Sequence, residues 1–189
     1  MAERGKVFVI TGPSGVGKGT LIAKLLEAVP ELELSVSATT REPRAGEVDG
    51  RDYHFLGEQE FERRVGAGDF LEHATYTGNR YGTLREAVEQ RLQSGRSVVL
   101  EIEVQGARQV RAAMPEAVLI FIAPPDPAAL RERLRERGTD SAEAIERRLR
   151  TAELELESRV EFPHVAVNDD LQKAASELEA LVRNQLSLH

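Results

Sequence analysis

Short apolar runs alternate along the chain with longer amphipathic or charged segments. Runs rich in valine, isoleucine and leucine that end at turn residues are typical of strands buried on both faces of a sheet. Such runs lie at 6–11, 97–103, 117–123 and 164–167, and the alternating segment 33–38 is a further strand candidate. Helical patterns begin at or near Lys18, Leu84, Gly106, Pro127, Ser141 and Asp170. This alternation predicts an α/β fold with a parallel sheet core and helices on both faces.

Two segments depart from this alternation. Residues 39–57 are polar, basic and rich in glycine, and they lead into a possible small sheet through Gly82. Residues 127–160 are rich in arginine and glutamate and have high helix propensity. We expect both to be excursions from the α/β core, where binding residues are often placed.

The first strand leads directly into a glycine-rich loop, "GPSGVGKGT" at 12–20. Glycines let successive backbone N–H groups converge on phosphate oxygens, and the start of a helix behind them favours anions. Here Gly12, Gly15 and Gly17 supply the turn, and Lys18 supplies the charge. The strand before the loop and the helix after it favour a phosphate-binding loop over an ordinary turn.

The loop departs from the usual pattern at Gly19, where a serine or threonine normally helps to hold Mg²⁺. Thr20 follows one residue later. Mg²⁺ readily keeps water ligands, so the loss of one hydroxyl is compatible with metal-bound nucleotide.

The composition narrows the choice of function. Hydrophobic residues make up 41% of the 189 residues and charged residues 30%, as in a water-soluble globular domain. The net charge of −7 argues against nucleic acid and anionic membranes as partners. No cysteine is present, which excludes disulfides and thiolate chemistry. No apolar run is long enough to cross a bilayer, so we expect a cytoplasmic protein.

The basic stretch after the second strand candidate suggests a phosphate acceptor. Arg41 and Arg44 lie three residues apart, and Tyr53 follows a turn that contains glycine. Two guanidinium groups can fork onto one phosphate dianion, and a tyrosine hydroxyl can add a third donor. A phosphate-binding loop alone is compatible with GTPases, ATPases and kinases, but no guanine-reading N-K-x-D motif is present. These features favour a kinase acting on a small anionic acceptor.

Seven short motifs, in their order along the chain, resemble those of bacterial-type guanylate kinases, and together they span nearly the whole chain. They are "GPSGVGKGT", "SVSATTREPRAGEVDGRDYHFL", "GNRYGT", "QGARQV", "FIAPP", "RERGTDS" and "VNDDL". The resemblance implies transfer of the γ-phosphate of ATP to GMP, with Mg²⁺ as cofactor. It also implies dGMP as a further acceptor. It also implies one domain over residues 1–189. Its regions would be a core (1–36, 92–125 and 160–189), a small mixed α/β GMP-binding excursion (37–91) and a helical lid (126–159).

The resemblance assigns the ATP site to the loop, the lid and the end of the last strand. The residues implied are Gly12, Pro13, Ser14, Gly15, Val16, Gly17, Lys18, Gly19, Thr20, Arg133, Arg137, Asn168 and Asp169. Asn168 and Asp169 would border the adenine, although capping of the following helix explains them equally well. The residues implied for catalysis are Lys18, Arg41, Arg137 and Arg148.

For GMP, the resemblance assigns Ser37, Arg41, Arg44, Tyr53, Glu72, Tyr81, Thr83, Glu103 and Arg148. Ser37, Glu72 and Thr83 would read the guanine. A carboxylate at Glu72 can accept hydrogen bonds from both N1–H and the N2 amino group of guanine, whereas adenine faces it with a bare acceptor.

Glu101 and Glu103 stand at the carboxyl end of a predicted strand, where ligands bind in open α/β sheets. Their spacing predicts that they face the same side. Related enzymes usually have aspartates here. The two glutamates could act on the waters of Mg²⁺, on guanine or on the arginines. We expect ATP phosphates and water to hold Mg²⁺ mainly, with Thr20 or Glu101 as candidate protein ligands.

Two other functions stay open. One is a nucleoside monophosphate kinase with a different acceptor, such as AMP or UMP. The other is a non-catalytic binding module with a guanylate-kinase-like fold. The oligomeric state is open as well.

Overall fold

The computed structural model describes residues 4–76, 78–136 and 142–188. It contains two compact units. The first comprises Met1–Val7, Glu31–Leu100 and Gln105–Ala117, and the second comprises Phe8–Pro30, Glu101–Val104 and Val118–His189. Each unit is described by itself below.

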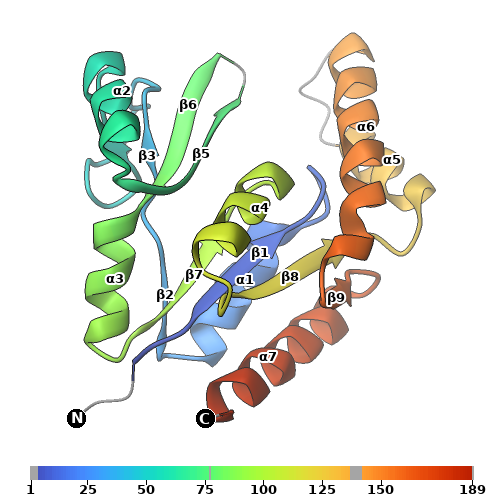
Figure 1. The fold of residues 1–189 in the computed structure, drawn as a ribbon. Coiled ribbons are helices and arrows are strands. Elements are labelled where there is room, and N and C mark those ends of the chain that lie inside the picture. The colour runs from blue at the N-terminus through green and yellow to red at the C-terminus, as the bar shows by residue number, and fades with distance from the viewer. Residues whose placement is uncertain (1–3, 77, 137–141, 189) are drawn as a thin grey trace. The chain divides into compact units, whose positions relative to one another are not determined.

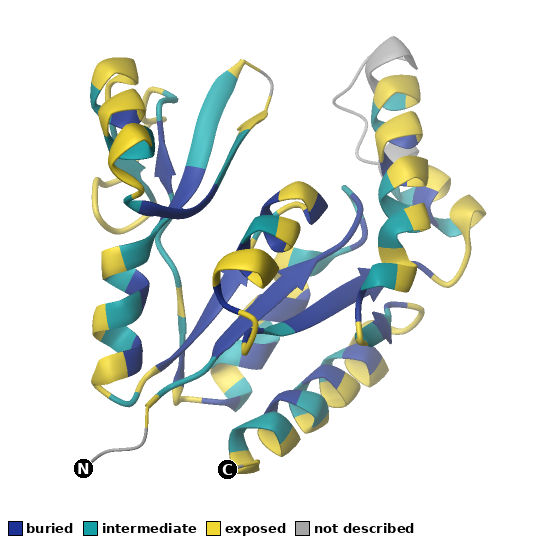
Figure 2. Ribbon diagram, in the orientation of Figure 1, coloured by how far each residue is buried: buried dark blue, intermediate teal, exposed yellow. Residues whose placement is uncertain are grey.

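Both units contain parallel strand pairs. In the second unit, β8 (Val118–Ala123) pairs in parallel with β9 (His164–Val167) and with β1 (Val7–Thr11), whose first residue belongs to the first unit. In the first unit, β2 (Leu32–Leu34) pairs in parallel with β7 (Ser97–Glu101). Strands β1 and β8 are almost wholly buried, as their dark blue colour in Figure 2 shows. The predicted α/β fold with a parallel sheet is therefore confirmed.

Two long helices of the second unit pack against each other. Helix α1 (Lys18–Ala28) begins at the glycine-rich loop and contacts α7 (Leu171–Ser187) (Figure 1). Asp170 caps α7, because its carboxylate accepts a hydrogen bond from the backbone N–H of Lys173 at 2.8 Å. At the far end of α1, Arg183 donates to the carbonyl of Ala28 at 2.6 Å. The helix cap predicted near "NDD" (168–170) is thus Asp170, the third residue of that stretch.

The second unit also contains two helices from the segment rich in arginine and glutamate. They are α5 (Pro127–Glu136) and α6 (Ala142–Glu157), and a short 3₁₀ turn, η1 (Ser158–Glu161), follows α6. Leu130 of α5 packs with Leu149 and Ala152 of α6 in a small core of their own. The charge-rich segment is therefore a helix pair with an apolar seam.

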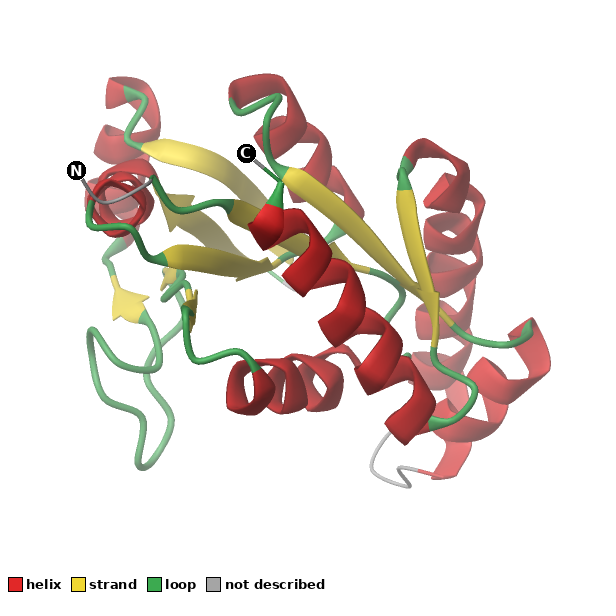
Figure 3. Ribbon diagram, turned by 90° about the horizontal axis from the view of Figure 1, so that it is seen from below, coloured by secondary structure: helices red, strands yellow, loops and turns green. Residues whose placement is uncertain are grey.

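The first unit contains a mixed sheet with the strand order β4-β3-β6-β5. The four strands are β3 (Ala38–Thr39), β4 (His54–Phe55), β5 (Phe70–Tyr76) and β6 (Asn79–Leu84). Helix α2 (Glu58–Ala67) covers this sheet through Phe61, which stacks on Phe70 with ring centroids 4.5 Å apart. Helix α3 (Arg85–Gln93) follows β6, and α4 (Val104–Ala113) belongs to this unit except for its first residue. Figure 3 colours all helices red and all strands yellow.

Several predicted boundaries were wrong. The candidate strand 33–38 is divided between β2 and β3, which belong to different sheets. Strand β7 ends at Glu101, so Glu103 lies in the connection to α4 rather than in the strand. Helix α4 starts at Val104, whose buried side chain begins its apolar face, and α2 was not predicted at all.

Candidate functional site

The loop after β1 has a backbone that requires glycine at two positions. Gly12 has φ +145°, and a Cβ built on it would lie 2.3 Å from the carbonyl oxygen of Ile122. Gly17 has φ +95°, and its Cβ would lie 2.7 Å from Nδ2 of Asn168. Both positions combine a left-handed backbone with a close approach by a neighbour. The fold thus fixes the curvature of this loop before any ligand binds.

Lys18 lies at the start of α1 with its side chain turned back to the loop. Its ammonium group donates to the carbonyl of Gly12 and, at 3.3 Å, to that of Pro13. Burial lowers the pKa of Lys18, and the negative charges of Glu155, Glu101 and Glu103 oppose that shift. A phosphate group would bring the additional negative charge that favours the protonated amine.

Asn168 is buried directly beneath the loop. Its side-chain amide donates to the carbonyl of Val16 at 2.8 Å, and its backbone N–H donates to that of Ala123. Asn168 therefore ties the loop to the end of β9. Asp169 is exposed. Contacts of either residue with adenine stay a prediction, and neither residue is the helix cap.

Two of the three predicted lid arginines contact the loop or its support. Arg133 of α5 donates to the carbonyl of Asn168 at 2.9 Å, and Arg148 of α6 donates to the hydroxyl of Ser14 at 3.0 Å. Arg137 lies outside the described residues. The structure thus brings Arg133 and Arg148 to the same loop as Lys18.

Gly19, which stands where related loops have a serine or threonine, faces the carboxylate of Glu101. A Cβ built on Gly19 would lie 3.9 Å from Oε1 of Glu101, which leaves ordinary contact space there. Partial burial raises the pKa of Glu103, and the charge of Lys18 opposes it. Among the described residues no group of three or more acidic or histidine side chains could hold a metal ion. These residues fit a Mg²⁺ ion that arrives with nucleotide phosphates. Glu101 and Thr20, the two candidate protein ligands, are both exposed.

In the first unit, Arg41, Tyr53 and Tyr81 lie together. The guanidinium carbon of Arg41 lies 5.2 Å from the ring centroid of Tyr53, and the rings of Tyr53 and Tyr81 meet edge to face at 6.2 Å. Strand β6 carries Tyr81, which is paired with Thr39 of β3. Three of the four predicted phosphate-binding side chains are therefore neighbours. The fourth, Arg44, is exposed in the same loop.

Glu47 binds this arginine cluster and was not singled out from the sequence. Its two carboxylate oxygens accept from Nη2 of Arg41 at 2.9 and 3.0 Å, and one of them also accepts from the backbone N–H of Arg44 at 2.7 Å. The hydrogen bond with Glu47 raises the pKa of Arg41, and Arg41 lowers the pKa of Glu47. The short spacing in "REPRAGE" was the available signal.

Glu72 and Thr83 form a buried polar pair between β5 and β6. They lie opposite each other in the strand register, and Oγ1 of Thr83 donates to Oε1 of Glu72 at 2.7 Å. Only 5% of Glu72 and 1% of Thr83 is exposed. Ser37 is half-buried, and its carbonyl accepts from the backbone N–H of His54 at 2.9 Å. A ligand with adjacent N–H groups offers the kind of donor from which a buried carboxylate accepts hydrogen bonds.

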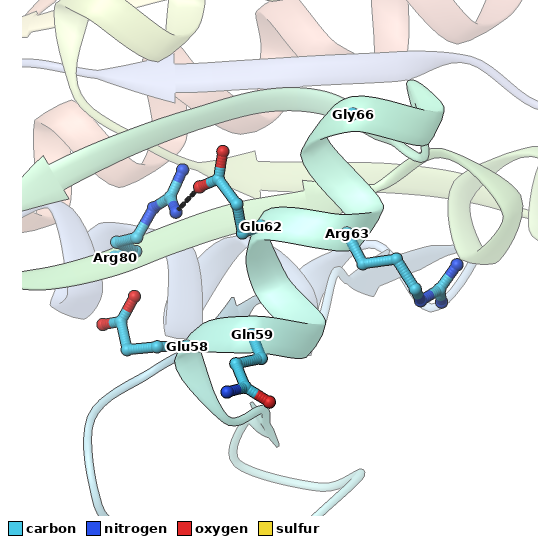
Figure 4. Close-up of a pocket in the computed structure, with 6 residues that line it drawn as sticks. All are labelled: Glu58, Gln59, Glu62, Arg63, Gly66 and Arg80. Carbon is cyan, nitrogen blue, oxygen red and sulfur yellow. Dashed lines mark hydrogen bonds and ion pairs between the residues drawn. The ribbon is translucent and has the colours of Figure 1, made fainter.

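A hollow on the outer side of α2 is lined by a different set of residues. They are Glu58, Gln59, Glu62, Arg63, Gly66 and Arg80 (Figure 4). Arg80 pairs with Glu62 and lies over the ring of Phe61 at 4.7 Å. None of the predicted site residues lines this hollow, so it is distinct from the acceptor residues of the same unit.

The family model for guanylate kinase matches residues 4–185 of the chain. The chain belongs to the guanylate kinase family. The guanylate kinase of Synechococcus sp. (strain CC9311) is 56% identical over 171 residues, which cover 90% of each chain. That of Rubrobacter xylanophilus is 53% identical over 181 residues, 96% of this chain and 95% of its own.

A solved guanylate kinase has a similar fold. The crystal structure of guanylate kinase from Anaplasma phagocytophilum has a TM-score of 0.77 and 34% identity, and the match covers 98% of this chain and 88% of that one. The family predicted from the motifs is thus confirmed. No helix among the described residues has the length and apolar character needed to cross a membrane.

Proposed function

We propose that this member of the guanylate kinase family transfers the γ-phosphate of ATP to GMP, giving ADP and GDP. The observation that carries the proposal is the buried carboxylate of Glu72, which the hydroxyl of Thr83 holds in a fixed position. Family membership supports the reaction class, and this pair supports guanine as the acceptor base.

Glu72 would accept hydrogen bonds from N1–H and the N2 amino group of guanine. A buried carboxylate left without donors is costly, so a base with an acceptor at this edge would be rejected by about 10⁴-fold or more. Ser37 and Thr83 would complete the contacts with the base. Discrimination between guanine and other bases would therefore depend on the buried carboxylate of Glu72.

The phosphate of GMP would bind to Arg41, Arg44, Tyr53 and Tyr81. Glu47 provides a carboxylate to Arg41 and to the backbone of Arg44. An incoming phosphate dianion offers more oxygens and more charge than a carboxylate, and it can bind both guanidinium groups. The contacts of Glu47 support the proposal that this arginine cluster is an anion site.

The donor would bind at residues 12–20, with backbone N–H groups and Lys18 on its phosphates. Arg133, Arg137 and Arg148 of the lid, with Asn168 and Asp169 near the base, would complete the site. The contacts of Arg133 and Arg148 with the loop support this placement.

The transfer needs no strong protein base, because the attacking phosphate oxygen of GMP is already anionic. The migrating phosphoryl group spreads negative charge over its equatorial oxygens. Lys18, Arg41, Arg137 and Arg148 would compensate that charge in a site from which water is excluded. When bound, Mg²⁺ would neutralise further charge on the ATP phosphates. Glu103 would contribute to the acceptor side.

The setting follows from the same chemistry. We expect the enzyme to act in the cytoplasm, in purine nucleotide metabolism, with ATP and GMP as small-molecule substrates and dGMP as an alternative acceptor. Nucleic acid and membranes are not expected partners.

The test measures ADP formation from ATP and Mg²⁺ with GMP, dGMP, AMP, UMP or no acceptor. We expect rapid ADP release with GMP and dGMP and almost none with AMP, UMP or water. Release with AMP would leave the phosphate loop in place but contradict the role of Glu72. No release with any acceptor, together with retained GMP binding, would favour a non-catalytic binding module.

A further inference from the structure

Helix α6 contacts the phosphate loop through two side chains of opposite charge. Arg148 and Glu155 are seven residues apart, so they lie on one face of the helix, two turns from each other. Arg148 donates to the hydroxyl of Ser14 at 3.0 Å, and a hydrogen bond from the backbone of Ser14 lowers the pKa of Glu155, against the effect of burial. All of these residues belong to the second unit. One loop residue is therefore held by both ends of this face.

The carboxylate of Glu155 is incompletely satisfied. Its Oε2 atom is buried and has no hydrogen-bond partner among the described residues. Burial raises the pKa of Glu155, the charge of Lys18 opposes this shift, and the negative charge of Glu103 adds to it. A buried carboxylate oxygen without a donor is unfavourable, so packing of the helix pair must hold it there.

The loop at residues 12–20 has the features of an anion-binding site. Gly12, Gly15 and Gly17 have positive φ angles, which suit a backbone that binds anions, and Lys18 adds a positive charge. Three carboxylates raise the pKa of Lys18 against the effect of burial, and Glu155 contributes most, ahead of Glu101 and Glu103. Glu155 also accepts from the loop backbone. This carboxylate therefore interacts with both features that the loop offers to a phosphate.

We propose that Glu155 is an internal anion of the phosphate loop, which competes with the phosphates of the donor nucleotide and thereby sets the affinity of the loop for them. The inference rests on the proposed binding of ATP at residues 12–20. When a nucleotide binds, the negative charges of its phosphates repel the carboxylate, and α6 gives up its contact with Ser14 through Glu155. Arg148, on the same face, is then available to the phosphates. The two charges on α6 thus have opposite effects on nucleotide binding.

The test compares ADP binding by the full chain and two variants, by titration calorimetry without GMP. Glu155→Gln keeps the shape and a carbonyl acceptor for Ser14 but removes the charge. The matched control is Glu157→Gln, which removes the same charge from an exposed position at the end of the same helix. We expect ADP to bind about tenfold more tightly to Glu155→Gln, and Glu157→Gln to stay within about twofold of wild type. Glu155→Ala provides a second variant if Glu155→Gln is poorly folded.

An unchanged or weaker affinity of the folded Glu155→Gln variant would overturn the inference. Weaker binding would indicate that Glu155 positions Lys18 or the bound phosphates instead. A purely structural role would lower the melting temperature without tightening ADP binding. If wild type bound no ADP at all, the placement of the donor at the loop would fail, and the inference with it. Tight binding by wild type without a gain in the variant would overturn only the inference.

Discussion

The two proposed phosphate sites are built in different ways. At the donor loop, close approaches of Gly12 to Ile122 and of Gly17 to Asn168 fix the backbone. At the acceptor cluster, a loop with open space around Gly46 and Gly50 carries long side chains, and Glu47 orders Arg41 through a forked ion pair. The donor site is thus made from main-chain geometry, and the acceptor site from side-chain chemistry.

This difference has a consequence for binding. Backbone amides held by the fold need little reordering when a phosphate arrives, and they respond to any phosphate. Arginine side chains can release one anion and bind another, and the neighbouring side chains select which ligand binds. We therefore expect the donor region to set turnover and the acceptor region to set specificity.

The largest expected effect is at the donor loop. Lys18→Ala removes the cation whose ammonium group lies against the loop carbonyls, so turnover should fall by at least about 10³-fold. The measurement is kcat for ADP formation at saturating GMP, alongside thermal unfolding. Lys24→Ala, on the same helix, is the matched control and should keep near-normal turnover. Normal turnover in a folded Lys18→Ala variant would contradict the donor assignment.

A smaller, more selective effect is expected at the acceptor base. Glu72→Gln replaces one of the two acceptor oxygens with a donor, so kcat/KM for GMP should fall by about 10²-fold, with little change in the KM for ATP. Steady-state kinetics with GMP and with AMP as acceptor measure kcat/KM for the acceptor and the KM for ATP. Glu58→Gln, at an exposed position of α2, should change neither. An unaltered preference for GMP over AMP in Glu72→Gln would show that guanine is read elsewhere.

The smallest effect separates backbone strain from close contact. Gly17 and Gly46 have similar φ values of +95° and +89°, but only the Cβ of an alanine at 17 would meet a neighbour. Both substitutions incur about 1–2 kcal/mol of left-handed strain. Gly17→Ala should further weaken ADP binding by about tenfold, because it displaces Asn168 or the loop. Gly46→Ala should leave ADP affinity unchanged. Equal losses of ADP affinity in the two variants would show that strain alone matters.

The sequence was most informative where a motif depends on the backbone. "GPSGVGKGT" predicted the loop, its strand and its helix correctly, since glycine spacing reports φ angles directly. The division of 33–38 between two sheets was not predictable, because the break depends on pairing with β7 and β4, which are distant in sequence. Helix α2 was missed because its charged face obscured the single buried anchor, Phe61.

Residue roles that depend on tertiary neighbours were also missed. Glu47 and Glu155 are glutamates in charge-rich stretches, where most carboxylates are solvated. Only the folded chain shows that Glu47 binds Arg41 and that Glu155 reaches Ser14. Asn168 follows the last strand, as predicted. Its contact with adenine stays a prediction, and its hydrogen bond to Val16 could not be predicted from the sequence.

The hydrogen bond from Arg183 to the carbonyl of Ala28 links the last turns of the chain to the helix that starts at the phosphate loop. Proteolytic clipping upstream of Arg183 would expose that carbonyl and part of the surface of α1 that α7 covers. Ragged C-terminal ends in a purified preparation would therefore give molecules in which α1 is unequally covered by α7. Intact-mass measurement of the C-terminus is consequently a useful quality check before any binding constant is compared between batches.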